Sequence, residues 1–346
     1  MKRIISFILV FASLFTVLAF AGSSAEAASY TAFFYEQHQQ FNCNDLTSGY
    51  TGIEDGGPAF YGNSLCYMDY HNFGICVRNS LNGKTKKVAS IPRALRHGVV
   101  EYTVYKNYFY YTDYFGGYLY KCALNGKYHK AIRKISSVRD DSLGVSLIAA
   151  NNKLVICVVD HEGTENNSGL FICDLNGKNY KRITADKTRD AYSWGSNLYF
   201  INDTLKKLMC YNFKTQKMYA VYNTACIDDR VGTIGMDGKY YYVSKSINKY
   251  SSLETEIIYR IDTAKRTAKI IAKWPGIFVA VGGGKLYAVY GESVYKFNAK
   301  KGTFALLRRF PANTTLVKPC FYKNKLIVEK WVTDVRSHKF YIVDTV

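Results

Sequence analysis

The chain has 346 residues, of which 48% are hydrophobic, and it carries a formal net charge of +19 at pH 7. This apolar content supplies a large core, and the nine cysteines form no Cys-x-x-Cys pair, which excludes the zinc-finger and small disulfide-framework classes. The basic excess favours anionic partners such as cell-wall polymers, lipid head groups or acidic glycans. A solvated basic surface is the simpler explanation, because the lysines are spread along the chain without a run of five like charges.

The N-terminus predicts a secretory signal peptide over residues 1–27. A basic start, Met1-Lys2-Arg3, precedes the apolar run 4–21, and Ala25-Glu26-Ala27 fits a small-x-small cleavage site. A retained membrane anchor is the alternative, since the run is about long enough to span a bilayer. We expect removal, and therefore a secreted or cell-surface-associated protein in which residues 28–346 form one domain.

Downstream, one short pattern recurs seven times at intervals of about 40–46 residues. It consists of a turn residue, usually a polar residue, and then a large apolar residue that begins a strand. This pattern is followed by a loop, a second strand, a polar turn and a third run such as "KAIRKI" or "KRIT". It is preceded by an apolar run such as "GVSLIAA". The copies are Asn63-Ser64-Leu65, Asn107-Tyr108-Phe109, Asn152-Lys153-Leu154, Ser196-Asn197-Leu198, Gly238-Lys239-Tyr240, Gly284-Lys285-Leu286 and Asn324-Lys325-Leu326.

Four short strands in each copy predict an all-β fold. We expect a seven-bladed β-propeller of four-stranded antiparallel blades, with six blades as the alternative. One twisted sheet cannot bury both of its faces, so neighbouring blades must cover it, and the strand before each signature is expected to be innermost. The last copy lacks an outer strand. The segment 29–37, "SYTAFFYEQ", is predicted to supply that strand and close the ring.

The second copy contains Tyr110-Tyr111-Thr112-Asp113 and then Leu124-Asn125-Gly126. These residues resemble the YWTD repeat of low-density-lipoprotein-receptor-type propellers, with Tyr111 in place of Trp and Asn125 in place of Asp. Tyr67-Met68-Asp69 with Leu81-Asn82-Gly83, and Leu175-Asn176-Gly177, are partial echoes. The chain is similar in kind to secreted bacterial propellers of this type. The resemblance implies a protein-binding platform, usually of six blades, and it carries over no catalytic residue.

The loops that lead into the predicted innermost strands contain several acids and arginines, which would converge at the mouth of a central channel. They suggest a site for a polar ligand or a cation. Loop-closing salt bridges and turn caps are the more common role of such residues and are favoured here. The candidates are Arg96, His97, Asp140, Asp141, Arg189, Asp190, Asp229, Arg230 and Trp274.

Three further features are candidate sites. Tyr114 and Phe115 lie at a predicted hairpin tip beside two glycines and are expected to form an exposed contact patch. Cys66 and Cys76 lie equidistant from His71, which suggests a disulfide across two strands. The loop that begins at Asp160-His161-Glu162 could bind a metal or transfer protons, but a lone exposed histidine is the more common case.

Enzyme motifs such as G-x-S-x-G or a phosphate-binding glycine-rich loop do not occur in the sequence. We therefore predict a secreted, non-enzymatic, monomeric propeller that binds a protein or an anionic cell-surface polymer. No cofactor, no metal and no specific nucleic acid partner is expected. The alternative is a glycan-active hydrolase that uses Asp140 or Asp141 with Asp229. It requires two carboxylates roughly 5–9 Å apart across an open channel.

Overall fold

The computed structural model describes residues 30–36, 59–61, 64–69, 74–78, 85–90, 99–113, 117–135, 143–160, 168–229, 231–247, 255–275, 278–312, 315–322, 325–331 and 337–344. They form β-strands and turns, with one 3-10 helix, η2 (Thr224–Cys226). Within these residues no helix has the length and apolarity needed to cross a membrane. The predicted signal peptide, residues 1–27, lies outside the described residues.

The described strands form seven four-stranded antiparallel sheets, numbered here by their order in the chain. Sheet 1 contains β2 (Ala59–Tyr61), β3 (Ser64–Asp69), β4 (Gly74–Arg78) and β5 (Thr85–Ser90). Sheet 2 contains β6 (Val99–Tyr105), β7 (Tyr108–Asp113), β8 (Tyr118–Ala123) and β9 (Lys130–Lys134). Sheet 3 contains β10 (Leu143–Ala150), β11 (Lys153–Asp160), β12 (Gly169–Asp174) and β13 (Lys181–Thr184). Sheet 4 contains β14 (Thr188–Trp194), β15 (Asn197–Asn202), β16 (Lys207–Asn212) and β17 (Met218–Asn223). Sheet 5 contains β18 (Gly232–Asp237), β19 (Tyr240–Ile247), β20 (Thr255–Asp262) and β21 (Thr267–Trp274). Sheet 6 contains β22 (Phe278–Gly282), β23 (Lys285–Tyr290), β24 (Ser293–Asn298) and β25 (Thr303–Arg309). Sheet 7 contains β26 (Thr315–Tyr322), β27 (Lys325–Trp331), β28 (Ser337–Asp344) and β1 (Tyr30–Glu36).

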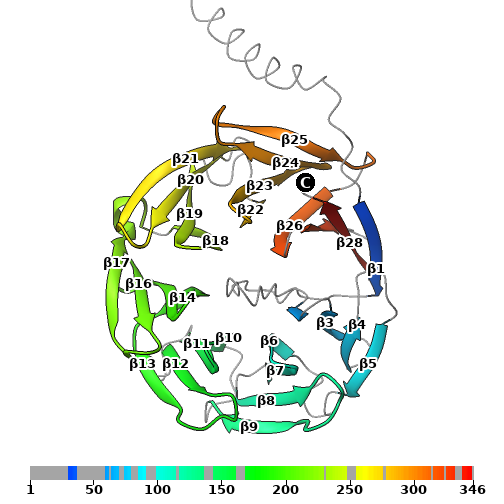
Figure 1. Cartoon of the computed structure of the whole chain (residues 1–346), viewed down its shortest axis with the longest axis vertical. Helices are drawn as coiled ribbons and strands as arrows, with labels where there is room; N and C mark the ends of the chain where they lie inside the picture. Colours follow the sequence, from blue (N-terminus) through cyan, green and yellow to red (C-terminus); the bar gives the residue numbers. More distant parts are fainter. Residues whose placement is uncertain are drawn as a thin grey trace, which may run out of the picture.

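The sheets are arranged around a common centre, as in a β-propeller (Figure 1). The strand that precedes each predicted signature lies nearest the centre, as β6, β10 and β14 show, and the fourth strand lies at the periphery. Inner strands of consecutive sheets contact one another from β2 through β26. The all-β, propeller-like architecture predicted from the repeat is therefore confirmed.

The first strand of a sheet turns back into the second through residues with positive φ. Lys106 and Asn107 have φ of 48° and 65°, Asn151 and Asn152 have φ of 51° and 62°, and a glycine pair occupies the same place at 283–284. Two consecutive positive φ values define the type I′ hairpin turn, whose twist matches that of the flanking strands. The Asn and Gly residues of the sequence signature are there because they tolerate this conformation.

Among the described residues, six hydrophobic clusters lie between consecutive sheets, and each combines buried residues of both neighbours. In β7, Phe109 and Tyr111 belong to the cluster shared with sheet 1, whereas Tyr110 belongs to the cluster shared with sheet 3. Alternate residues of a strand face opposite sides, so a strand covered on both sides is apolar throughout. This explains the unbroken aromatic run. Full burial of a phenylalanine ring such as that of Phe109 contributes about 1.5–3 kcal/mol relative to exposure.

The pairing register shifts between the third and fourth strands of six sheets, for example between Leu119 and Tyr120 and between Leu170 and Phe171. A β-bulge increases the local twist of a strand pair. The repeated shift therefore turns the outermost strand relative to the rest of its sheet in the same way from blade to blade.

The N-terminal strand β1 pairs with the C-terminal strand β28. The ladder is antiparallel and runs from Tyr30 opposite Val343 to Glu36 opposite Ser337. In sheet 7 the strand order is β1-β28-β27-β26, so β1 occupies the outermost position that the fourth strand takes in the other sheets.

Candidate functional site: the Arg189 network and the basic outer strands

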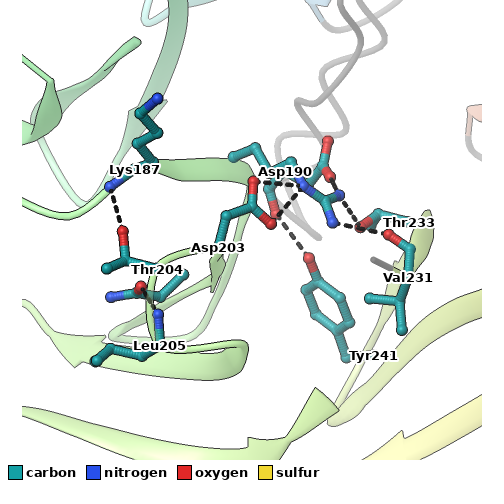
Figure 2. A network of polar contacts seen from close by, with 10 residues as sticks. Lys187, Asp190, Asp203, Thr204, Leu205, Val231, Thr233 and Tyr241 are labelled. Carbon is teal, nitrogen blue, oxygen red and sulfur yellow. Dashed lines mark hydrogen bonds and ion pairs between the residues drawn. The ribbon is translucent and has the colours of Figure 1, made fainter. Parts of the chain in front are cut away.

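Arg189 and Asp190, two of the predicted channel-mouth residues, lie near the start of the inner strand β14. The register between β14 and β15 shifts between Arg189 and Tyr192, and Asp190 has a positive φ of 53°. A bulge of this kind re-aims the side chains around it. Here it brings Arg189 and Asp190 into one polar network with Asp203, which follows β15, and with groups of β18 and β19 (Figure 2).

The Arg189 guanidinium has a partner on every nitrogen. Its Nε lies 3.0 Å and 2.9 Å from the two carboxylate oxygens of Asp203, and one terminal nitrogen donates to Asp190. The same nitrogen makes a weaker contact of 3.4 Å with Thr233 Oγ1, and the other terminal nitrogen donates to the backbone carbonyl of Val231 at 2.8 Å. Since Val231 and Thr233 belong to the start of sheet 5, the network joins sheets 4 and 5.

The electrostatics of this network are those of a structural ion-pair cluster. Burial by itself would lower the pKa of Arg189, but the charges of Asp190 and Asp203 outweigh burial and raise it. The hydroxyl of Tyr241 donates to the Asp190 carbonyl at 2.7 Å and fixes the bulge from the side of sheet 5 (Figure 2). Both carboxylates are thus occupied by the guanidinium, as expected for a loop-closing salt bridge.

Two other predicted mouth residues are described. Asp229 forms an exposed ion pair of 2.5 Å with Lys206. Trp274 is in a different place from the one expected: it ends the outermost strand β21, is only 5% exposed, and packs against Phe304 at a centroid distance of 4.6 Å. The prediction that Trp274 lines the channel mouth is therefore wrong, because its ring fills the core between sheets 5 and 6.

The predicted disulfide between Cys66 and Cys76 is wrong. Cys66 is a free thiol, and the register places it opposite Val77, whereas Cys76 is opposite Tyr67. The offset of one residue turns the two side chains to opposite faces of sheet 1. Burial raises the pKa of Cys66 to about 12.

Several predicted site residues lie outside the described residues. They are Arg96, His97, Tyr114, Phe115, Asp140, Asp141, His161, Glu162 and Arg230. In the part of the chain that is described, no group of three or more His, Cys, Asp or Glu residues is placed to hold a metal ion.

A feature that the sequence analysis missed lies on the outermost strands of sheets 1 to 3. The strands β5, β9 and β13 each carry two or three basic residues and no acidic residue. All of these basic side chains are exposed. The three strands follow one another along the periphery (Figure 1). We call this surface the basic arc; it consists of Lys86, Lys87, Lys130, Arg133, Lys134, Lys181 and Arg182.

The basic arc has clear limits along the periphery. The outer strand of sheet 4, β17, has the uncharged sequence MYAVYN, and β1, the outer strand of sheet 7, contains no basic residue. Lysine on an edge strand also prevents edge-to-edge association. The sequence signal for the arc was the basic character of the runs "KAIRKI" and "KRIT", which becomes meaningful once each run is known to be the outermost strand.

Solved structures of other proteins share this architecture. An oligogalacturonate lyase in complex with manganese matches with a TM-score of 0.61 and 13% identity, over 92% of this chain and 98% of that chain. An oligogalacturonate lyase from Vibrio parahaemolyticus matches with a TM-score of 0.60 and 12% identity, over 92% of this chain and 98% of that chain. A puromycin-hydrolyzing peptidase from Mycobacterium tuberculosis matches with a TM-score of 0.58 and 9% identity, over 90% of this chain and 55% of that chain.

At these identities the similarity shows the β-propeller fold alone, and this fold hosts many unrelated functions. No protein-family model matches the sequence, and no curated protein matches it.

Proposed function

We propose that the protein is a secreted binding propeller that recognises an anionic cell-surface polymer through the basic arc. One observation carries the proposal: three consecutive outer strands present seven exposed basic side chains and no acidic one. The signal-peptide pattern in residues 1–27 supports a location outside the cell, where such polymers occur.

The geometry of the arc suits an extended polyanion better than a compact ligand. Neighbouring outer strands succeed one another along the rim, so that a chain lying across them meets basic side chains of each blade in turn. Each cation neutralises one charge of the polymer and releases a counterion, which makes binding fall steeply as the salt concentration rises.

We also infer that the seven sheets close into a ring, with β1 as the strand that completes it. The complete ladder between β1 and β28 supports this inference, as do the contacts between consecutive inner strands. Membership of the YWTD family stays a prediction, carried by the Tyr111 and Leu124-Asn125-Gly126 motifs.

The hydrolase alternative has less support than binding. It relied on carboxylates at the channel mouth, and the two described ones are both ion-paired, Asp190 with Arg189 and Asp229 with Lys206. Each carboxylate is thus already engaged by a basic side chain instead of facing a second carboxylate, as the hydrolase alternative requires.

A binding assay with matched charge variants tests the proposal. The arc variant carries Lys86→Thr, Lys134→Thr and Lys181→Thr. The control variant removes the same charge at exposed turn lysines of sheets 4 to 6, Lys214→Thr, Lys265→Thr and Lys300→Thr. The probes are polygalacturonate and poly(glycerol phosphate), with dextran as the neutral polymer.

We expect the unaltered protein to bind at least one of the anionic polymers and not dextran. The arc variant should bind about tenfold more weakly, since each exposed charge contact contributes about 0.5–1 kcal/mol, and the control variant should bind almost normally. Equal loss in both variants would show a response to net charge alone and would contradict a role for the arc.

A further inference from the structure

A pocket of about 380 Å³ lies on the basic arc, at the end of sheet 2 that faces sheet 3. Its size falls within the range of small-molecule sites. The walls come from β7, β8, the β8–β9 turn, β9 and the β12–β13 turn. The lining residues are Tyr108, Lys121, Tyr128, Lys130, Ala131, Ile132 and Asn176.

The pocket is positively charged. It contains two lysines and no carboxylate, and among the described residues no ion pair joins Lys121 or Lys130 to an acidic side chain. Burial, and then the charge of Lys130, lowers the pKa of Lys121. The two ammonium groups therefore repel one another, and a bound anion would relieve this repulsion.

Lys121 is held in a fixed position. Its Nζ lies 3.9 Å from the centroid of the Tyr108 ring and donates to the Leu175 carbonyl at 3.3 Å. An ammonium group has three donors, so these contacts leave it able to bind an anion. A prepositioned donor loses less side-chain entropy on binding than a free surface lysine does.

The rest of the pocket suits a sugar-sized ring. Tyr128 is 69% exposed and offers its ring to solvent, and Ala131 and Ile132 supply apolar surface. Asn176 accepts the Lys178 amide through Oδ1, so its Nδ2 group can donate to a hydroxyl or an anion. Aromatic and apolar walls with a few placed polar groups are typical of ligand sites.

We propose that this pocket binds one anionic unit, a sugar ring that carries a carboxylate or a phosphate, with Lys121 and Lys130 on the anion and Tyr128 against the ring. Lys130 belongs to the basic arc as well, so the unit would be part of the polymer that lies along it. In this respect the inference rests on the proposed function and deepens it: the arc supplies charge, and the pocket supplies selectivity.

The test measures small-molecule binding to the full chain by calorimetry, with glucuronate, glucose 6-phosphate and uncharged glucose as probes. Lys130→Met removes a pocket lysine that is exposed, so the fold should persist. Lys214→Met removes the same charge at an exposed turn lysine of sheet 4, outside both the pocket and the basic arc. We expect binding of at least one acid but not of glucose, about tenfold weaker binding in Lys130→Met, and no change in Lys214→Met.

The outcomes separate the pocket from the arc. Binding of either acid supports the pocket and identifies the anion that it prefers. Equal affinities of the two variants, or binding of neither acid at millimolar concentration, would overturn the pocket. If the small acids bind while the polymers of the previous section do not, the pocket stands and the proposed function fails.

Discussion

Gly126 lies directly against the backbone of Val88 in the preceding sheet. A Cβ on Gly126 would be 2.0 Å from the Val88 carbonyl oxygen, and one on Gly177 would be 2.3 Å from the carbonyl oxygen of Ile132. Both glycines have positive φ, 84° and 79°, and both end a Leu-Asn-Gly motif in the turn between the third and fourth strands. The motif that resembles the YWTD repeat thus marks a close approach between neighbouring blades.

The first prediction concerns this contact. Gly177→Ala should lower the free energy of unfolding by clearly more than Gly302→Ala, which also has a positive φ, 67°, but has no atom within 4 Å of an added Cβ. The strain of an alanine with positive φ is about 1–2 kcal/mol, and only Gly177→Ala adds a steric clash. Urea unfolding measures both variants. Equal losses would show that the backbone conformation alone requires glycine at 177.

The second prediction concerns the Arg189 network. Asp203→Asn removes one of the two carboxylates that compensate a largely buried guanidinium, and we expect a loss of about 1–3 kcal/mol. The control is Asp229→Asn, which breaks an exposed pair with Lys206 and should change stability little. Similar effects of both substitutions would contradict the structural role assigned to the network.

The third prediction is a pH dependence that arises from His129. Its Nε2 lies 2.7 Å from the Tyr111 hydroxyl, and burial lowers its pKa from the ordinary value of 6.5. As the pH falls, His129 therefore takes up a proton at a higher pH in the unfolded chain than in the folded one. The free energy of unfolding keeps its full His129 contribution above pH 6.5 and loses it as the pH falls below that value. In His129→Gln the decrease in unfolding free energy between pH 7 and pH 5.5 should be smaller. An identical pH profile would contradict the assignment.

The fourth prediction concerns the thiols. Cys226 is exposed in η2, whereas Cys122 is buried and its pKa is raised to about 11. Because the thiolate is the reactive species, Cys226→Ser should remove one rapidly reacting thiol from a titration of the native protein with a disulfide reagent. Cys122→Ser should leave the fast phase unchanged. Retention of the whole fast phase in Cys226→Ser would show that Cys226 is shielded.

Much of the fold could be predicted because each repeat contains the turn residues and apolar runs that determine its own hairpins and strands. Asn107 and Gly284 mark turns that need positive φ, and the apolar runs around them follow from sheets covered on both sides. The errors arose where one residue of register decides the outcome. Asp69 pairs with Gly74, so the hairpin is not symmetric about His71, and Cys66 and Cys76 face opposite ways.

The candidate site was harder to predict than the fold. A sequence shows that Lys86, Lys130 and Lys181 recur in similar places, but only the strand order shows that all three lie on the periphery. Trp274 was misplaced for the same reason, since its position at the end of an outermost strand depends on which strand of the blade it terminates. The Arg189 pairings depend on a bulge that the local sequence does not reveal.

We infer that the faces of each sheet are covered by the neighbouring sheets in a closed ring that β1 completes. Amide hydrogen exchange of residues 30–36 tests it most directly, by comparison with the outer strand β13. We expect the β1 amides that pair with residues 337–343 of β28 to exchange as slowly as those of β13. Exchange of these amides at the rate of an unstructured peptide, with β13 still protected, would contradict it.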